Sequence, residues 1–194
     1  MKGMISIMPH GASVIRKIEF SASHFFWVAA WSAEENRHAF GPTANRFGHG
    51  HNYTLRVCVG GELDPHTGMV VNLKHLKRWM QQAIFKPLNF KHLNLQVPYF
   101  WDNQPTLESL AVYCWQRLVP YLKELGHTLT WLEIAESHDL CVRYRGGQCH
   151  EFNLDRVHAD SWEDTHETSP LLIQHPEYQG VLPVATVVKE PHLC

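Results

Sequence analysis

Residues 47–60 read Phe-Gly-His-Gly-His-Asn-Tyr-Thr-Leu-Arg-Val-Cys-Val-Gly, and from Tyr53 onward apolar side chains recur at every second position. This alternation predicts a β-strand over about residues 52–60 with one face against a core. The two histidines before it are two residues apart, so an extended backbone would point both imidazoles to one face, and Gly50 lets the chain pass close to whatever they hold. The segment therefore predicts a strand that opens with a two-ligand metal clip.

The sequence on either side predicts a strand, strand, helix, helix, strand, strand order. A period-two run indicates a long first strand, the Asn-, Gly- and Pro-rich stretch 31–50 indicates a loop, and residues 64–68 indicate a turn. Two further stretches have apolar residues at helical spacing: the first begins at Asn72 as its N-cap, and the second ends at Gly126. The expected elements are strands 13–28 and 52–60, a helix from Asn72 that ends before Pro87, a helix from Thr106 to Gly126, and strands at about 128–135 and 140–144.

Length and composition indicate one globular domain. The 194 residues are 44% hydrophobic and 19% charged with a net charge of -2, which gives no electrostatic reason to expect a nucleic-acid partner. Residues 1–13 lack the apolar core of a secretory signal, and no stretch approaches the roughly 18 apolar residues that span a bilayer. We expect a cytoplasmic protein without a membrane partner, whose five scattered cysteines are reduced.

The domain is expected to cover residues 14–151. After about Phe152 the sequence becomes rich in His, Asp, Glu and Pro and loses apolar periodicity. Residues 152–194 are therefore expected to form a C-terminal extension.

Fifteen histidines in a chain of this length suggest a metal site. His24 lies at the end of an apolar strand and is the best third ligand for the pair His49 and His51. Three imidazoles with one open position form the arrangement of a catalytic zinc site. By itself, a His-x-His pattern is weak evidence for a metal and more often marks ordinary surface or core histidines.

Several further motifs carry a family resemblance: Phe20–His24, Phe47–Tyr53, Gly68–Leu73, Lys86–Leu88 and Pro105–Glu108. In order and separation they resemble the 6-pyruvoyl tetrahydropterin synthase and 6-carboxytetrahydropterin synthase family over roughly residues 16–146. The resemblance implies a lyase-type enzyme with Zn²⁺ on His24, His49 and His51. It also implies an α+β tunnelling fold (T-fold): an antiparallel four-stranded sheet with two helices between strands 2 and 3, closed into a barrel by a homo-oligomer, a trimer or hexamer.

The resemblance also indicates substrate-binding residues. Glu136 matches the carboxylate that anchors the pterin, and a carboxylate can accept parallel hydrogen bonds from the 2-amino and N3 groups of a pterin. Thr43, Thr106 and Glu108 match positions near the same pocket. Thr106 and Glu108 are equally expected as the N-cap and first-turn acid of a helix, and Glu136 also fits an exposed carboxylate between strands.

Three positions depart from the family pattern. Thr43 stands where the synthases have a cysteine, and Asn89 and Phe90 stand where they have an Asp-His pair. A threonine hydroxyl without an adjacent base is a poor proton acceptor at neutral pH, and neither Asn89 nor Phe90 can transfer a proton, so the usual acid/base steps cannot run unchanged. The candidate replacement groups are His92, His138 and Asp139, with Glu34, Glu35 and His38 as further possibilities.

Three hypotheses follow for the function. The first is a repurposed lyase, cyclase or isomerase that uses zinc as a Lewis acid on a pterin or another small heterocyclic or carbonyl substrate. The second is a true synthase that processes dihydropterin triphosphate with substitute proton carriers. The third is a pterin-binding protein without catalysis. Aromatic residues beside His24, from Phe25 to Trp31, could wall a hydrophobic pocket in any of these cases.

Overall fold

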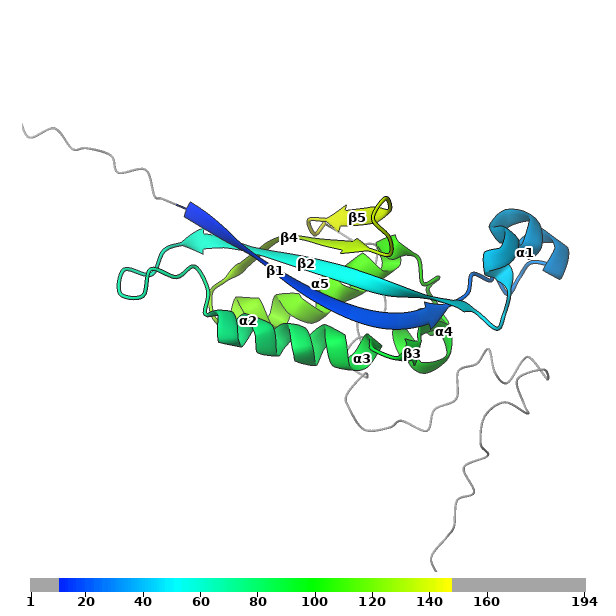
Figure 1. Ribbon diagram of the computed structural model, residues 1–194, viewed down its shortest axis with the longest axis horizontal. Coiled ribbons are helices and arrows are strands. Elements are labelled where there is room, and N and C mark those ends of the chain that lie inside the picture. The colour runs from blue at the N-terminus through cyan, green and yellow to red at the C-terminus, as the bar shows by residue number, and fades with distance from the viewer. Residues whose placement is uncertain (1–10, 148–194) are drawn as a thin grey trace, which may run out of the picture.

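A computed structural model describes residues 11–147, and its centre is a sheet ordered β3-β1-β2-β4-β5 (Figure 1). The strands β1 (Gly11–His24), β2 (His49–Glu62), β4 (Thr128–Ala135) and β5 (Cys141–Tyr144) form an antiparallel set in that order. The expected four-stranded antiparallel sheet is therefore confirmed. The added strand β3 (Lys91–His92) is two residues long and pairs in parallel with Ala22 and Ser23.

The helices cover one face of this sheet (Figure 1). α2 (Leu73–Met80) continues through a π-helical turn (Gln81–Phe85) into α3 (Lys86–Leu88), and α5 (Leu107–Glu124) packs beside it. Alternate side chains of β1 and β2, including Phe20, Tyr53 and Leu55, point toward these helices and are buried in the core. The N-caps are those expected, because the side chains of Asn72 and Thr106 accept hydrogen bonds from the amides of Lys74 and Ser109.

The first helix does not end before Pro87, and that expectation is wrong. Proline has no amide hydrogen to donate to a preceding turn. The turn Gln81–Phe85 uses wider i→i+5 hydrogen bonds, such as that from the Lys86 amide to the Gln81 carbonyl. Pro87 therefore falls at the start of the short α3, where its missing donor is not needed.

The expected extent of the first strand and the expected loop at 31–50 are also wrong. β1 ends at His24, and residues 33–40 form α1 (Ala33–Phe40). The amide of Glu35 donates to the Ser32 hydroxyl and the Glu35 carboxylate accepts from the Ser32 amide, a reciprocal cap. The buried side chain of Asn36 then accepts from the Val28 amide and donates to the Val28 carbonyl, which ties α1 to the preceding chain.

The remaining short elements are α4 (Leu93–Gln96) and the 3-10 turns Gly41–Ala44 and Pro98–Trp101. Cys58, Cys114 and Cys141 are free thiols. No helix within residues 11–147 has the length and apolarity to cross a bilayer, and the cytoplasmic location stays a prediction. The expected extension 152–194 lies outside the described residues, and the domain boundary at 151 therefore stays a prediction as well.

Candidate metal centre

Strand register brings the three predicted histidines together. His24 of β1 pairs directly with His49 of β2, and Ala22 pairs with His51. Directly opposed residues share a face of the sheet, as do residues two apart. The ring centroids are 4.5 Å apart for His24 and His49, 5.0 Å for His49 and His51, and 5.3 Å for His24 and His51. One ring nitrogen from each lies within 4.8 Å of the others, so the three can face a single ion.

His24 is held in the form that a metal requires. Its side chain is 1% exposed and its Nδ1 lies 2.9 Å from the carbonyl oxygen of Pro105. Because a carbonyl only accepts, Nδ1 carries the proton and Nε2 keeps its lone pair. Burial, followed by the neighbouring His49, lowers the pKa of His24 to about 4, so the ring is neutral.

The donor set fits zinc. The Nε2 atom of His24 is buried and has no hydrogen-bond partner among residues 11–147, and metal-ligating histidines characteristically donate their other N–H to a carbonyl, as here to Pro105. Burial, then the neighbouring His51, also lowers the pKa of His49. Three imidazole ligands would leave the fourth position of a tetrahedral ion open.

Glu136 and Tyr53 adjoin the histidines. Glu136 follows the end of β4, and its Oε2 lies 3.8 Å from Nε2 of His51. The ring of Tyr53 lies 5.6 Å from that of His51, and its buried hydroxyl has no partner in the described part of the chain. Burial and the charge of Glu136 both raise the pKa of Tyr53, so the phenol keeps its proton. Sequence reasoning missed Tyr53, although its place two residues after His51 puts it on the same face.

Part of the aromatic segment after β1 does reach the histidines. The Phe26 ring meets His24 edge-on at 4.9 Å and lies 5.7 Å from Phe40, on which Trp31 stacks. Trp27 lies instead under the guanidinium of Arg46. An apolar wall therefore borders one side of the site.

The three positions that depart from the family pattern make structural contacts. The Thr43 hydroxyl donates to the Phe40 carbonyl at 2.7 Å, and the Asn89 side-chain oxygen accepts from the Ser21 amide at 3.0 Å. Phe90 is 83% exposed. Within one chain, none of them offers a proton-transfer group to His24.

The proposed replacement proton carriers lie outside the three-histidine cluster of the described residues. His92 pairs with Ser23 and packs against Phe25, and burial lowers its pKa to about 4. It is close enough to His24 to be among the groups that lower the pKa of that residue. His138 and Asp139 lie in the β4–β5 turn and are 96% and 75% exposed. Their catalytic roles stay a prediction.

The other expected residues also have local structural roles. Glu35 caps α1, on which Glu34 and His38 are exposed. Thr106 caps α5 next to Pro105, whose carbonyl holds His24, and Glu108 is exposed in the first turn of α5. Of the residues expected to bind substrate, Glu136 is therefore the one that contacts the histidines.

The sequence and the fold were both compared with known proteins, and both match one family. The sequence profile described as 6-pyruvoyl tetrahydropterin synthase matches residues 13–147. The chain is 46% identical over 135 residues to the 6-pyruvoyl tetrahydrobiopterin synthases of Homo sapiens and Pongo abelii, which covers 70% of this chain and 92% of each relative. The solved Caenorhabditis elegans 6-pyruvoyl tetrahydropterin synthase superposes with a TM-score of 0.67 at 31% identity, covering 71% of this chain and 96% of that one. With its T-fold and its matched length, the chain belongs to the 6-pyruvoyl tetrahydropterin synthase family.

Proposed function

We propose that this chain is a zinc-dependent lyase-type enzyme that acts on a pterin or on another small heterocyclic or carbonyl substrate. The observation that carries the proposal is the buried Nε2 of His24, which has no partner in the described residues and faces the rings of His49 and His51. The family is one of lyase-type enzymes, and the relatives that share 46% identity are named as pterin synthases. These likenesses support a pterin as the first substrate to test.

Each residue has a definite part in this proposal. Bound zinc would supply Lewis-acid polarisation of a carbonyl or hydroxyl oxygen. The Pro105 carbonyl fixes the tautomer of His24, and β2 orients His49 and His51. The Glu136 carboxylate would accept from the 2-amino and N3 groups of a pterin. The protonated Tyr53 hydroxyl would donate to a substrate oxygen, and Phe26 would limit the access of water.

A second candidate is a true synthase that processes dihydropterin triphosphate with substitute proton carriers. The 46% identity to named synthases favours it. Because His138 and Asp139 are exposed and His92 lies outside the three-histidine cluster of the described residues, this candidate requires His92 to reach the substrate or a carrier from another copy. Within the described residues the outer edge of β1 is paired only at Ala22 and Ser23, and β5 is the last strand of the sheet. Edge pairing between copies would cover both edges and supports the proposed homo-oligomer.

The test is mass spectrometry of zinc-loaded protein incubated with 7,8-dihydroneopterin triphosphate. Zinc-dependent loss of triphosphate would support the synthase, whereas binding without turnover would direct the search to other substrates or to a non-catalytic pterin protein. His49→Ala should lower the zinc content, and Glu136→Gln should weaken pterin binding at unchanged zinc content. Normal zinc in His49→Ala contradicts the metal site, and normal pterin affinity in Glu136→Gln contradicts the pterin pocket.

A further inference from the structure

Charge is divided unevenly along this chain. Residues 11–147 contain 14 Lys and Arg against 11 Asp and Glu, whereas the extension 152–194 contains 2 against 7. The family profile ends at residue 147, so the acidic extension lies beyond the matched region. The net charge of -2 therefore combines a domain with an excess of cations and an extension with an excess of anions.

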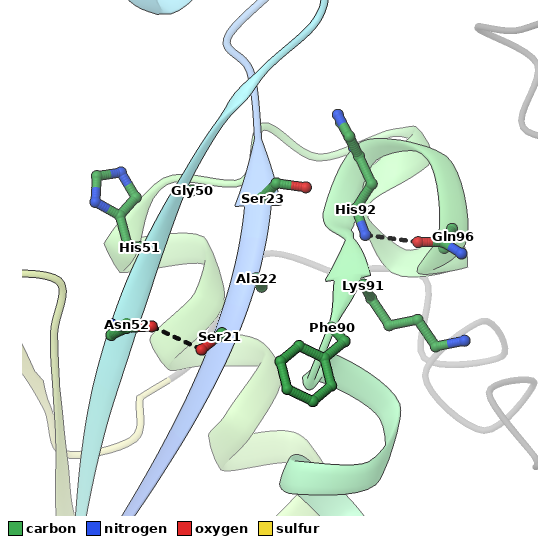
Figure 2. Close-up of a pocket in the computed structure, with 10 residues that line it drawn as sticks. All are labelled: Ser21, Ala22, Ser23, Gly50, His51, Asn52, Phe90, Lys91, His92 and Gln96. Atoms are coloured by element: carbon green, nitrogen blue, oxygen red, sulfur yellow. Dashed lines mark hydrogen bonds between the residues drawn. The ribbon is translucent and has the colours of Figure 1, made fainter. Parts of the chain in front are cut away.

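The cations of the domain are concentrated on α2 and the chain that follows it. Residues 65–101 contain five Lys and Arg and no Asp or Glu. Lys74, Lys77 and Arg78 are exposed, and their i, i+3, i+4 spacing places them on one side of α2. Lys91 continues the stretch beyond α3, and its side chain extends away from β1 (Figure 2). The three exposed cations of α2 are called here the basic face.

The basic face has no acidic partner in the domain. Among residues 11–147, none of its three side chains forms an ion pair or a side-chain hydrogen bond. Lys74 lies in the first turn of α2, where the helix dipole favours an anion, and that turn contains no acidic residue. A carboxylate placed beside this face would be attracted both by the three cations and by the helix dipole.

The extension carries carboxylates at a matching spacing. They are Asp160, Glu163, Asp164 and Glu167. Their i, i+3, i+4, i+7 pattern would place all four on one side of a helix, as the cations are placed on α2. A row of four negative charges would then lie against a row of three positive charges. This matched pattern favours the segment 160–167 over other anions as the occupant of the basic face.

The segment 160–167 is within reach of α2. A Cβ at Gly146 would contact the ring of Trp115, so the described chain ends against α5, which packs beside α2. A helix spacing of about 8–10 Å and a rise of about 1.5 Å per residue put the basic face on the order of 20 Å away. Residues 148–163 span up to about 50 Å. Because the segment is attached, its effective concentration at the basic face is about millimolar, which suits individually weak charge pairs.

We propose that residues 160–167 dock on the basic face of α2 of their own chain, with their carboxylates against Lys74, Lys77 and Arg78. The extension would then be an acidic arm that neutralises the basic face and covers it from other anions. This interaction surface depends neither on the zinc site nor on the substrate.

The test is crosslinking of the full-length, zinc-loaded protein with a water-soluble carbodiimide, which joins a lysine amine to a carboxylate only when the two are in contact. Peptide mass spectrometry should find Lys77 joined to residues 160–167, in a product with the mass of one chain. Raising the salt to 1 M, where the Debye length is about 3 Å, should remove most of this product.

Two charge reversals decide where the segment docks. Lys74→Glu should lower the yield of crosslinks at Lys77 by roughly threefold or more, because repulsion replaces attraction beside an unchanged amine. The variant should remain folded, since a glutamate suits the first turn of a helix. Arg37→Glu is the matched control, because it makes the same charge change at an exposed cation of α1, and it should leave the yield at Lys77 unchanged.

Four results would overturn the proposal. They are an equal yield at Lys77 in wild type and Lys74→Glu, no crosslink at Lys77, an even spread of crosslinks over the exposed Lys17, Lys77 and Lys123, and a product with the mass of two chains. The last would assign the basic face to another copy. Where Lys77 is not crosslinked, cosedimentation with phosphatidylserine vesicles that Lys74→Glu abolishes would assign the face to a membrane surface instead.

Discussion

Zinc should stabilise this chain through three of its fifteen histidines. In the metal-free chain the buried Nε2 of His24 lacks a partner among the described residues, and an unsatisfied buried polar group costs about 1–3 kcal/mol. A ligand that binds only the folded state, at a hundredfold excess over its Kd, adds about 2.7 kcal/mol. With a shift of about 2–4 °C per kcal/mol for a protein of this size, zinc should raise the Tm by roughly 5–11 °C.

The assay is scanning calorimetry of chelator-stripped protein with and without added zinc. His49→Ala should lose nearly all of the rise, because one of three clustered ligands is removed. His138→Ala is the matched control, since that ring is almost fully exposed and lies outside the cluster, and it should keep the rise. An equal rise in wild type and His49→Ala would refute the reasoning, because zinc would then act through other histidines.

Three further predictions concern stability and activity. Hydrogen bonds from Arg143, then Arg56, hold the pKa of Glu133 below its unfolded value of about 4.3. The ionised carboxylate therefore stabilises the fold above that pH, and this contribution is lost as the pH falls through the lowered pKa. In Glu133→Gln, the free energy of unfolding measured in urea should fall less steeply with decreasing pH than in the wild type. Gly146→Ala should lower the free energy of unfolding in urea by roughly 1–3 kcal/mol more than Gly68→Ala. Both glycines have a positive φ, but a Cβ at Gly146 would lie 2.5 Å from the Trp115 ring, whereas a Cβ at Gly68 would have no atom within 4 Å. Equal losses of stability would contradict this packing. The triple variant Thr43→Cys, Asn89→Asp, Phe90→His should gain turnover of 7,8-dihydroneopterin triphosphate, measured by mass spectrometry. The fold should tolerate it, because a carboxylate at position 89 can still accept the hydrogen bond from the Ser21 amide and histidine adopts the positive φ of Phe90 more readily than phenylalanine. A folded, zinc-loaded variant without turnover would show that the activity requires more than these three groups.

Local patterns were sufficient for the main elements. The alternation through Tyr53 and the caps at Asn72 and Thr106 are short-range signals, and the structure follows them. α1 was missed because few of its residues are apolar, although the Ser32 and Glu35 cap was readable in the sequence. The helix end was predicted wrongly at Pro87 because a π-helical turn before the proline lets the helix continue into α3. β3 was missed because a strand of two residues is too short to show an alternating pattern.

The candidate metal site was likewise partly predictable from local sequence and partly not. The sequence by itself determined that His49 and His51 share a face, because their spacing within one strand decides it. Only the tertiary structure decided that His24 stands opposite His49, that the Pro105 carbonyl 81 residues away orients its ring, and that Glu136 comes within 3.8 Å of His51. Strand register and the packing of α5 against the sheet set these distances, and both depend on contacts between residues far apart in the chain, which no local pattern records.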